Sequence, residues 1–350
     1  MSEKQRVLVH LAEGSLAPRT AKTTRGVIAY GVHRSAAVID STKVGKTCHE
    51  CLGVGGDIPV LATLEQALAL SPRPDTLLVG ITNQGGILPA EMRQPILLAL
   101  EEGLDVWNGM HEFLSLDPEM ALLSQKTGAK IWDVRRPKFP LPVGHGARIK
   151  PKTPALLSVG TDCSVGKMTA LLEFQKAAKL RHLDTPFIPT GQTGMMIAGF
   201  GHPIDAIPGD FMAGCVEQDC QLFDGKSDLI LVEGQGSLWH PGFSSVTLSL
   251  LHGAMPDLLL LCHEAGRTHI GKREHVAIPP LDVVQREYER TMAIYKESRT
   301  IGVALNTWSL PEDDAREAVA QAAKLTGLPA TDPARFGAEL LVEAALAAMK

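Results

Sequence analysis

The stretch LLSVGTDCSVGKMTALLEF, from Leu156 to Phe174, has glycines and a lysine at a spacing that suits phosphate binding. Glycines let a short loop turn until consecutive backbone N–H groups face one anion, and the neighbouring lysine adds a positive charge. An apolar run precedes this loop and a helical pattern follows it, which is the order of a P-loop. We therefore predict an anion site made of Gly160, Thr161, Asp162, Cys163, Ser164, Val165, Gly166, Lys167, Met168 and Thr169.

This loop departs from the common P-loop in two ways. The spacing of Gly160 and Gly166 is one residue longer than in G-x-x-x-x-G-K, and here the loop resembles those of dethiobiotin synthetase and cobyrinate amidase-type ATPases. Met168 stands where a Ser or Thr would hold magnesium, and a thioether is a poor ligand for that cation. Thr169 is rotated by about 100° around the helix. We expect an anion cradle that requires no metal, and magnesium only if the chain hydrolyses ATP.

Three side chains are candidates for proton transfer. Glu233 ends the apolar run in DLILVEGQGSL, where a Walker B carboxylate would lie, and His240 follows it in the same loop. Asp210, in IDAIPGDFMAG, begins a helical pattern, so it is either a second candidate base or only a helix cap. The residues alone leave the choice of base open.

Other polar residues in glycine-rich loops are candidates for binding a substrate. Gln192 and Thr193 lie in PTGQTGMM, and Gln235 follows Glu233 by two positions. Arg267 and Lys272, in EAGRTHIGK, would suit an anion such as a carboxylate or phosphate. No H-E-x-x-H pattern occurs among the histidines of this region, and we predict no metal site.

Composition limits the classes of protein to consider. The 350 residues carry a net charge of −5, with 45% hydrophobic and 21% charged residues, and no basic block occurs. We therefore expect small-molecule substrates and neither a nucleic acid nor a membrane as partner. Without a secretory pattern at the start we expect a cytoplasmic protein with reduced cysteines. Cys48 and Cys51 have C-x-x-C spacing, but no second pair completes a zinc site.

Strand and helix signals alternate in the second half. We expect strands over 155–160, 184–191, 228–238, 257–266 and 300–307, with helices after the loop at Lys167, over 280–298 and 312–327, and from Ala338 to Lys350. Continuous apolar strands separated by helices predict a doubly wound parallel sheet, whose ligands bind at the carboxyl ends of the strands.

The first half shows a similar alternation. We expect strands over Gly26–Gly31, Ala36–Asp40, Thr76–Ile81 and Leu104–Gly109, and helices over 63–70 and 88–103. The stretch Asp40–Thr47 ends in Gly-Lys-Thr, but it lacks a first glycine and CHECLGVGG after it is a poor helix, so its role stays open. The stretch from Arg135 to Pro154 is rich in proline and glycine and is typical of a linker. The prediction is an α/β chain with domains over 1–145 and 146–350.

Taken together, these motifs resemble one family. GTDCSVGKMTA, TGQTGMMIAG, IDAIPGDFMAG, VEGQGSLWHPG and LLHGAMPD are similar to stretches of the D-glutamate N-acetyltransferase family, long described as a domain of unknown function. The resemblance extends from about Arg25 to Ala345. It implies a Rossmann-like N-terminal domain followed by a P-loop NTPase-like domain. It also implies transfer of an acetyl group from acetyl-CoA to the amine of D-glutamate.

This implied activity accounts for the unusual loop. Coenzyme A carries phosphates but needs no hydrolysis, so a P-loop without its magnesium hydroxyl could hold one of them; which phosphate stays open. Acyl transfer also needs a base, N–H donors for the oxyanion and cations for the substrate carboxylates. Glycine-flanked amides near 192–194 or 235–237 are the candidate donors. The alternatives are an ATP-dependent ligase or kinase-like enzyme of the dethiobiotin synthetase type, and a nucleotide-responsive regulatory protein. We expect a homo-oligomer, although no motif defines its size.

Overall fold

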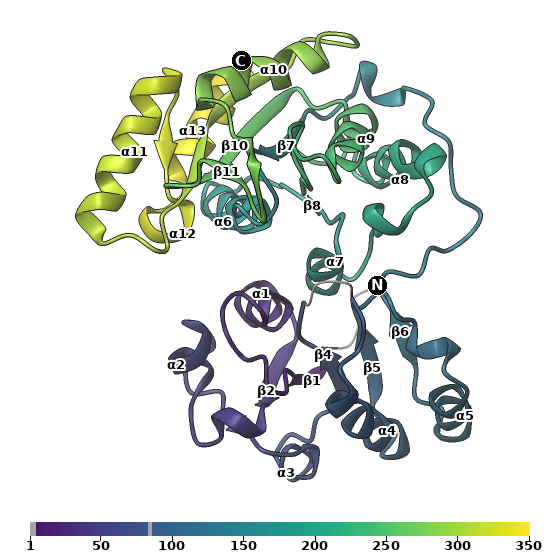
Figure 1. Cartoon of the computed structure of the whole chain (residues 1–350). Coiled ribbons are helices and arrows are strands. Elements are labelled where there is room, and N and C mark those ends of the chain that lie inside the picture. The colour runs from purple at the N-terminus through teal and green to yellow at the C-terminus, as the bar shows by residue number, and fades with distance from the viewer. Residues whose placement is uncertain (1–4, 83–85) are drawn as a thin grey trace. The chain divides into compact units, whose positions relative to one another are not determined.

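The structure is a computed structural model that describes residues 5–82 and 86–350. It divides into two compact units (Figure 1). The first contains the described residues up to Pro137 together with Gln192–Pro203, and the second contains Lys138–Gly191 and Ile204–Lys350. The first unit runs to Pro137 and the second begins at Lys138, whereas the boundary predicted from the sequence lies after residue 145. The first unit also includes a short segment from the second half of the sequence.

The first unit is built on a six-stranded parallel sheet with strand order β3-β2-β1-β4-β5-β6, which is the order of a Rossmann fold. Its strands are β1 (Val7–Leu11), β2 (Arg34–Ile39), β3 (Val60–Leu61), β4 (Thr76–Val79), β5 (Asp105–Asn108) and β6 (Ile131–Asp133). Its helices are α1 (Lys22–Tyr30), α2 (Cys48–Leu52), α3 (Leu64–Leu68), α4 (Arg93–Glu101), α5 (Pro118–Thr127) and α7 (Gln192–Ala198). The central strands are almost wholly buried, as expected for apolar strands covered on both faces.

Helix α7 explains why the first unit includes residues from the second half. It packs against α1, and Thr193 Oγ1 lies 2.9 Å from Thr23 Oγ1. Met195, Met196 and Ile197 are buried there. An apolar face of this kind must be covered by a neighbouring element, and α1 covers it.

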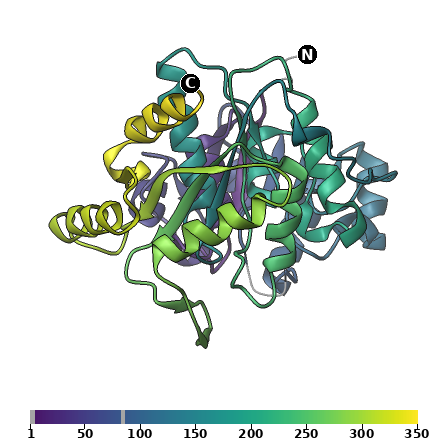
Figure 2. The same ribbon diagram turned by 90° about the horizontal axis from the view of Figure 1, so that it is seen from above.

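The second unit has its own six-stranded parallel sheet, in the order β14-β13-β10-β7-β9-β8. Its strands are β7 (Ala155–Gly160), β8 (Phe187–Ile188), β9 (Ile230–Val232), β10 (Leu258–Glu264), β13 (Arg299–Asn306) and β14 (Ala330–Thr331). Its helices are α6 (Lys167–Leu180), α8 (Gly209–Gln221), α9 (Ser244–Ala254), α10 (Leu281–Met292), α11 (Glu312–Thr326), α12 (Pro333–Phe336) and α13 (Glu339–Ala348). An antiparallel hairpin, β11 (His269–Ile270) with β12 (Arg273–Ala277), projects from the unit (Figure 2).

Local sequence explains several element ends. Helix α11 starts after Pro311 with three acidic residues in its first turn, which favour the positive end of the helix dipole. It ends at Gly327, whose φ of 70° closes the helix in the left-handed conformation. Buried Arg148 holds the start of the unit by bonding Asp224 Oδ1 at 2.7 Å and the carbonyl oxygen of Thr153 at 3.0 Å.

Two of the sequence-based assignments in the first half are wrong. Gly26–Gly31 was expected to be a strand, but these residues lie in helix α1 and at its end, with Thr23, Thr24, Gly26 and Val27 facing the interior. A short apolar run fits either element, and packing against α7 decides it. Residues 48–52, expected to be a poor helix, form α2 because Thr47 and Glu50 make a reciprocal capping box. Strand β1, at the centre of this sheet, was not predicted.

None of the described helices is both long and apolar enough to cross a bilayer. The parallel strands of each sheet end on one edge, and in the second unit the sequence motifs meet at the edge where β7, β9 and β10 end.

Candidate active site

The P-loop follows β7 directly. That strand ends at Gly160 and helix α6 begins at Lys167, after Gly166 turns the chain with a φ of 104°. Only glycine adopts that conformation without strain. The backbone N–H groups of residues 165–169 donate no hydrogen bond to any described residue. Unpaired N–H groups at the start of a 14-residue helix are the donors that an anion binds.

Lys167 is buried inside this loop rather than extended into solvent. Its Nζ donates to the carbonyl oxygen of Asp162 at 2.7 Å and to that of Gly236 at 2.9 Å. Burial lowers the pKa of the Lys167 ammonium. The lysine thus joins the P-loop to the loop after β9, and its positive charge lies between them.

Asp162 connects the P-loop to the segment that follows β10. Its Oδ2 accepts hydrogen bonds from Arg267 at 2.8 Å and from the Gly271 N–H of the hairpin at 2.7 Å. Arg267 also donates to the carbonyl oxygen of Cys163 and pairs with Glu264. The Arg267 guanidinium is therefore already bonded to the P-loop and to Glu264. A substrate carboxylate could bind it only beside these partners or in place of one of them.

Glu233 lies at the end of β9, the strand next to β7, as its place in the sequence suggested. One carboxylate oxygen, Oε2, accepts the N–H groups of Thr190 at 2.9 Å and Gly191 at 3.2 Å. The other, Oε1, accepts no hydrogen bond from any described residue. Burial raises the pKa of Glu233 to about 7, although the two N–H groups and Lys167 oppose the shift. A held carboxylate with one unpaired oxygen and a pKa near 7 suits a general base.

The loop after Glu233 carries unused donors. Gln235 binds back to Thr190 through its side chain, with Nε2 donating to the carbonyl oxygen at 2.6 Å. The backbone N–H groups of residues 235–237 donate to no described residue. The hydroxyl of Ser237 is buried and also has no partner among the described residues. Gly234 lets this loop approach β7, where its N–H donates to Ser158 Oγ at 2.9 Å.

His240 presents a donor rather than an acceptor to this site. Its Nδ1 accepts the N–H of Gly242 at 3.1 Å, so in the neutral ring the proton must be on Nε2. Burial, followed by the positive charge of Arg273, lowers the pKa of His240. The ring is also stacked on Phe243, with centroids 4.5 Å apart. A neutral imidazole in this tautomer cannot take a proton at Nε2.

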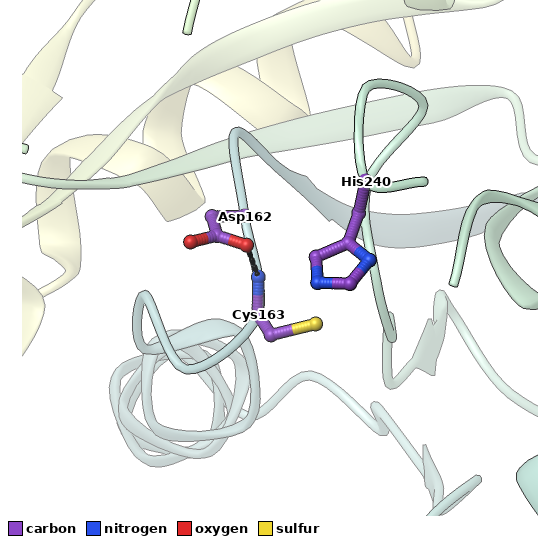
Figure 3. A group of neighbouring side chains, drawn as sticks. All are labelled: Asp162, Cys163 and His240. Carbon is purple, nitrogen blue, oxygen red and sulfur yellow. Dashed lines mark hydrogen bonds between the residues drawn. The ribbon is translucent and has the colours of Figure 1, made fainter. Parts of the chain in front are cut away.

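Asp162, Cys163 and His240 form a cluster of metal-ligand type (Figure 3). Their donor atoms all lie within 4.8 Å of one another. However, both oxygens of Asp162 already accept hydrogen bonds, and Lys167, Arg273 and Arg267 place positive charge at Cys163. Burial raises the pKa of the Cys163 thiol, which opposes the thiolate that a metal requires. This surrounding suits an anion better than a cation.

The remaining predicted site residues are more scattered. Asp210 is exposed in the first turn of α8. The cap residue of this helix is Pro208, which makes no side-chain cap hydrogen bond, so Asp210 is not the helix cap. Lys272 is exposed at the tip of the hairpin with a φ of 61°. Gln192 and Thr193 belong to the first unit, where Gln192 Oε1 accepts Arg135 Nε at 3.1 Å. Their roles in binding a substrate stay predictions.

The structure adds residues that the motifs did not single out. The Tyr288 hydroxyl, on α10, donates to the carbonyl oxygen of Gly160 at 2.7 Å and accepts the N–H of Leu238. His263 Nδ1 lies 2.8 Å from Thr161 Oγ1. Thr190, which holds both Glu233 and Gln235, lies near the end of the strand predicted over 184–191 and two residues after the observed β8, a position from which it could have been found. Tyr288 lies in an ordinary helical pattern, so no local signal marked it.

Fold and site together define a two-domain α/β protein whose second domain carries a P-loop. Comparison with known families agrees: residues 41–137 match the Rossmann-like domain of the family DUF1611, and residues 142–342 match its P-loop domain. A crystal structure of a DUF1611 family protein from Anabaena variabilis is similar over 98% of this chain and 100% of that one, with a TM-score of 0.93 and 38% identity.

Two curated relatives carry a functional name. A D-glutamate N-acetyltransferase of Tritonibacter scottomollicae is 39% identical over 293 residues, which is 81% of this chain and 84% of the relative. Another, from a Pseudoalteromonas species, is 35% identical over 268 residues, covering 76% of this chain and 80% of the relative. The chain belongs to the D-glutamate N-acetyltransferase family, as the motifs indicated, and is thereby an N-acetyltransferase.

Proposed function

We propose that this protein transfers the acetyl group of acetyl-CoA to the amine of D-glutamate and so forms N-acetyl-D-glutamate. The named relatives support the acceptor and the type of transfer. The site supports the donor, because the P-loop offers unpaired N–H groups and Lys167 to a phosphate while Met168 replaces the magnesium hydroxyl. Coenzyme A needs such a cradle and no hydrolysis.

The reaction begins with a proton transfer. The ammonium of the amino acid must lose a proton before nitrogen can attack, and Glu233 Oε1 is the acceptor that the geometry favours. The amine then attacks the thioester carbonyl carbon, a C–N bond forms and the carbonyl oxygen becomes an oxyanion. Collapse of this intermediate breaks the C–S bond. One of the two protons on nitrogen passes to the thiolate, which leaves as the free thiol of CoA, and the other remains as the N–H of the amide product.

The oxyanion needs hydrogen-bond donors that are already in place. The N–H groups of residues 235–237 are unpaired, and they lie in the loop that directly follows the base. The Nε2–H of His240 is a further donor, and the low pKa of this imidazole keeps it neutral. We therefore assign His240 as a donor and Glu233 as the base, in preference to exposed Asp210.

The acceptor carries two carboxylates. Lys272 and Arg273, on the hairpin, together with Arg267 beside the P-loop, are the nearby cations that could bind them. Of these, Arg267 would have to exchange part of its pairing with Asp162 or Glu264.

One observation carries this proposal above the alternatives, namely the buried Glu233 at the end of the strand beside the P-loop strand. An ATP-dependent ligase would need a magnesium ligand after Lys167, and Met168 does not supply one. A regulatory nucleotide binder would not need a carboxylate with a pKa near 7 and an unpaired oxygen beside the anion site.

The test is a direct assay on the purified protein. Acetyl-CoA and D-glutamate should release free CoA thiol and form N-acetyl-D-glutamate in equal amounts, whereas L-glutamate, a control with the same charges, should react much more slowly. Release of the CoA thiol without N-acetyl-D-glutamate would show that the protein hydrolyses acetyl-CoA as a thioesterase and does not transfer the acetyl group. Product formed only with Mg-ATP would favour the ligase.

A further inference from the structure

A groove opens at the carboxyl edge of the second sheet, on the side of the P-loop away from Glu233. Its volume is about 370 Å³, within the range of about 300–1,000 Å³ typical of small-molecule sites. Strand ends, the segment after β10 and one face of α11 form its walls. Its lining includes His263, Arg267, Ile278, Leu305, Ala318 and Gln321.

This groove adjoins the anion cradle through two of its own wall residues. His263 is bonded to Thr161, and Arg267 is bonded to Asp162 and to the Cys163 carbonyl oxygen. A ligand with a phosphate on the P-loop amides could therefore extend past these side chains into the groove without crossing another element. A backbone bond fixes another part of the lining, where the Ile278 N–H donates to the Thr268 carbonyl oxygen at 2.8 Å.

The lining suits a flat heterocycle that has apolar faces and polar edges. Aliphatic side chains dominate, including Ile278, Leu281 and buried Leu305, and Leu325 stands 52% exposed at the rim although it is a large hydrophobic residue. His263, Arg267, Thr268 and Gln321 supply the polar part of the lining and could hydrogen-bond the ring nitrogens of a heterocycle. Ligand pockets commonly combine apolar walls with a few polar groups that orient the ligand.

Strand order determines which end of coenzyme A this groove would take. Strand β7, which carries the P-loop, lies between β9 and β10. Glu233 and the unpaired N–H groups of residues 235–237 follow β9, so the thioester must lie on that side. In coenzyme A the diphosphate separates the thioester arm from the adenosine. Holding the diphosphate at β7 therefore leaves the adenosine on the β10 and β13 side, where the groove is.

We propose that this groove binds the adenine ring of the acetyl donor, an inference that rests on the proposed use of acetyl-CoA. Coenzyme A then spans the sheet edge, with its purine between α11 and the Ile278 wall, its diphosphate on the P-loop and its thioester beside Glu233. The purine takes no part in the reaction, and burying it equally in the ground state and in the transition state lowers the KM for the donor without raising kcat.

A matched pair of variants on α11 tests this. Ala318 lines the groove, whereas Ala320, two positions along the same helix, is exposed and does not. Ala318→Trp should fill the groove and raise the KM for acetyl-CoA about 10- to 100-fold with little change in kcat, the loss expected when one ring-sized apolar group is no longer buried. Ala320→Trp adds the same side chain outside the groove and should behave like the wild type. Equal melting temperatures of the two variants would show that both are folded.

Truncated ligands separate this inference from the proposed function. S-acetyl-4′-phosphopantetheine keeps a phosphate for the P-loop but lacks adenosine, so Ala318→Trp should leave its kcat/KM unchanged. Adenosine 3′,5′-bisphosphate has no acetyl group, and calorimetry should show it binding to the wild type and at least about tenfold more weakly to Ala318→Trp.

The outcomes are distinct. An unchanged KM for acetyl-CoA in folded Ala318→Trp overturns the groove assignment while leaving acetyl transfer intact. If the wild type turns over neither donor, the proposed function fails, and the bisphosphate alone decides the groove. If Ala318→Trp then binds the bisphosphate more weakly than the wild type does, the purine site is still supported. If the wild type does not bind the bisphosphate, or if Ala318→Trp and Ala320→Trp bind it equally well, the purine site is overturned.

Discussion

At the scale of single residues, the structure holds Glu233 in one place through Oε2, while Oε1 has no partner among the described residues. Thr190 and Gly191 hold Oε2 through their backbone N–H groups, and Gln235 holds Thr190 in turn. Such preorganisation keeps the carboxylate oriented, and burial raises its pKa by more than the two N–H groups and Lys167 lower it. The positive charge of the site stays with Lys167, whose own bonds go to the carbonyl oxygens of Asp162 and Gly236.

Replacing Glu233 with Gln should remove the base and retain the shape of the loop, because the amide oxygen can still accept the Thr190 and Gly191 N–H groups. We expect kcat to fall about 10²- to 10⁴-fold. Affinity for acetyl-CoA, measured by calorimetry, should stay close to that of the wild type. Near-normal turnover in Glu233→Gln, together with loss of activity in Asp210→Asn, would transfer the role of base to Asp210.

The pH dependence should reflect the same carboxyl. Because the pKa of Glu233 is raised to about 7 and the base must be ionised, kcat/KM should rise as the pH passes through about 7 and then level off. Stability should move the opposite way. A carboxyl whose pKa is higher in the folded than in the unfolded state stabilises the fold below its unfolded pKa of 4.5, and this contribution is lost as the pH rises through about 7.

At pH 8 Glu233→Gln should therefore be more stable than the wild type, by up to about 3 kcal/mol. Denaturant unfolding at pH 5 and pH 8 measures both free energies. A difference that does not grow with pH would show that Glu233 ionises normally in the folded protein.

Met168 leads to a prediction about metals. Turnover of acetyl-CoA and D-glutamate should survive dialysis against EDTA, because no step assigned to the site needs a cation other than protein side chains. Residual activity after chelation is the measurement, with added Mg²⁺ as the control. A complete loss of activity that only added Mg²⁺ restores would contradict the prediction that the P-loop works without a metal, and it would favour the ligase alternative.

At the scale of elements, the site depends on how closely the loop after β9 approaches β7. A Cβ atom at Gly234 would lie 1.6 Å from the carbonyl oxygen of Ser158, a distance that no packing adjustment of side chains can relieve. The neighbouring Lys167 side chain would be only 3.1 Å away. The absence of a side chain at this position therefore sets the distance between the base and the anion cradle.

Gly234→Ala should force β7 and the Glu233 loop apart. We expect a loss of about 1–3 kcal/mol of stability or more, together with a large fall in kcat. Gly209→Ala is the matched control, because no atom lies within 4 Å of a Cβ there and the residue starts helix α8. That variant should stay within about 0.5 kcal/mol of the wild type. Equal melting temperatures for the two variants would mean that the close approach is not needed.

At the scale of the whole molecule, one segment belongs to a different unit from the residues on either side of it in the sequence. Helix α7 follows β8 of the second unit in the sequence, yet it completes the first unit by covering α1. The first unit thus includes a short segment from the second half of the sequence and depends on residues that follow the P-loop.

Met196, fully buried in α7, tests this dependence. Met196→Asp should increase amide hydrogen exchange in α1 and the adjacent strands of the first unit, since it buries an unpaired charge there. Exchange in β10 and β13 of the second unit should change little. Ala198→Asp, at a partly exposed position of the same helix, is the control and should have a much smaller effect. Faster exchange centred on the second unit would assign α7 to that unit.

The sequence alone determined most of the second unit. Strands β7, β10 and β13 are largely apolar runs, and several helices have clear ends, so local signals agree with the final fold. Strand β7 was predicted over the same residues that the structure shows, 155–160. The P-loop and Glu233 could be found because their chemistry requires particular residues directly after such strands.

Only the tertiary structure decided the rest. Residues 26–30 are helical because α1 packs on α7, a segment more than 160 residues away, and no local pattern contains that contact. Which oxygen of Glu233 is held, which nitrogen of His240 carries the proton and where Arg267 is paired depend on neighbours that folding brings together. The sequence specifies which groups can do chemistry, whereas their basicity and hydrogen bonding are set by burial and by partners from other strands.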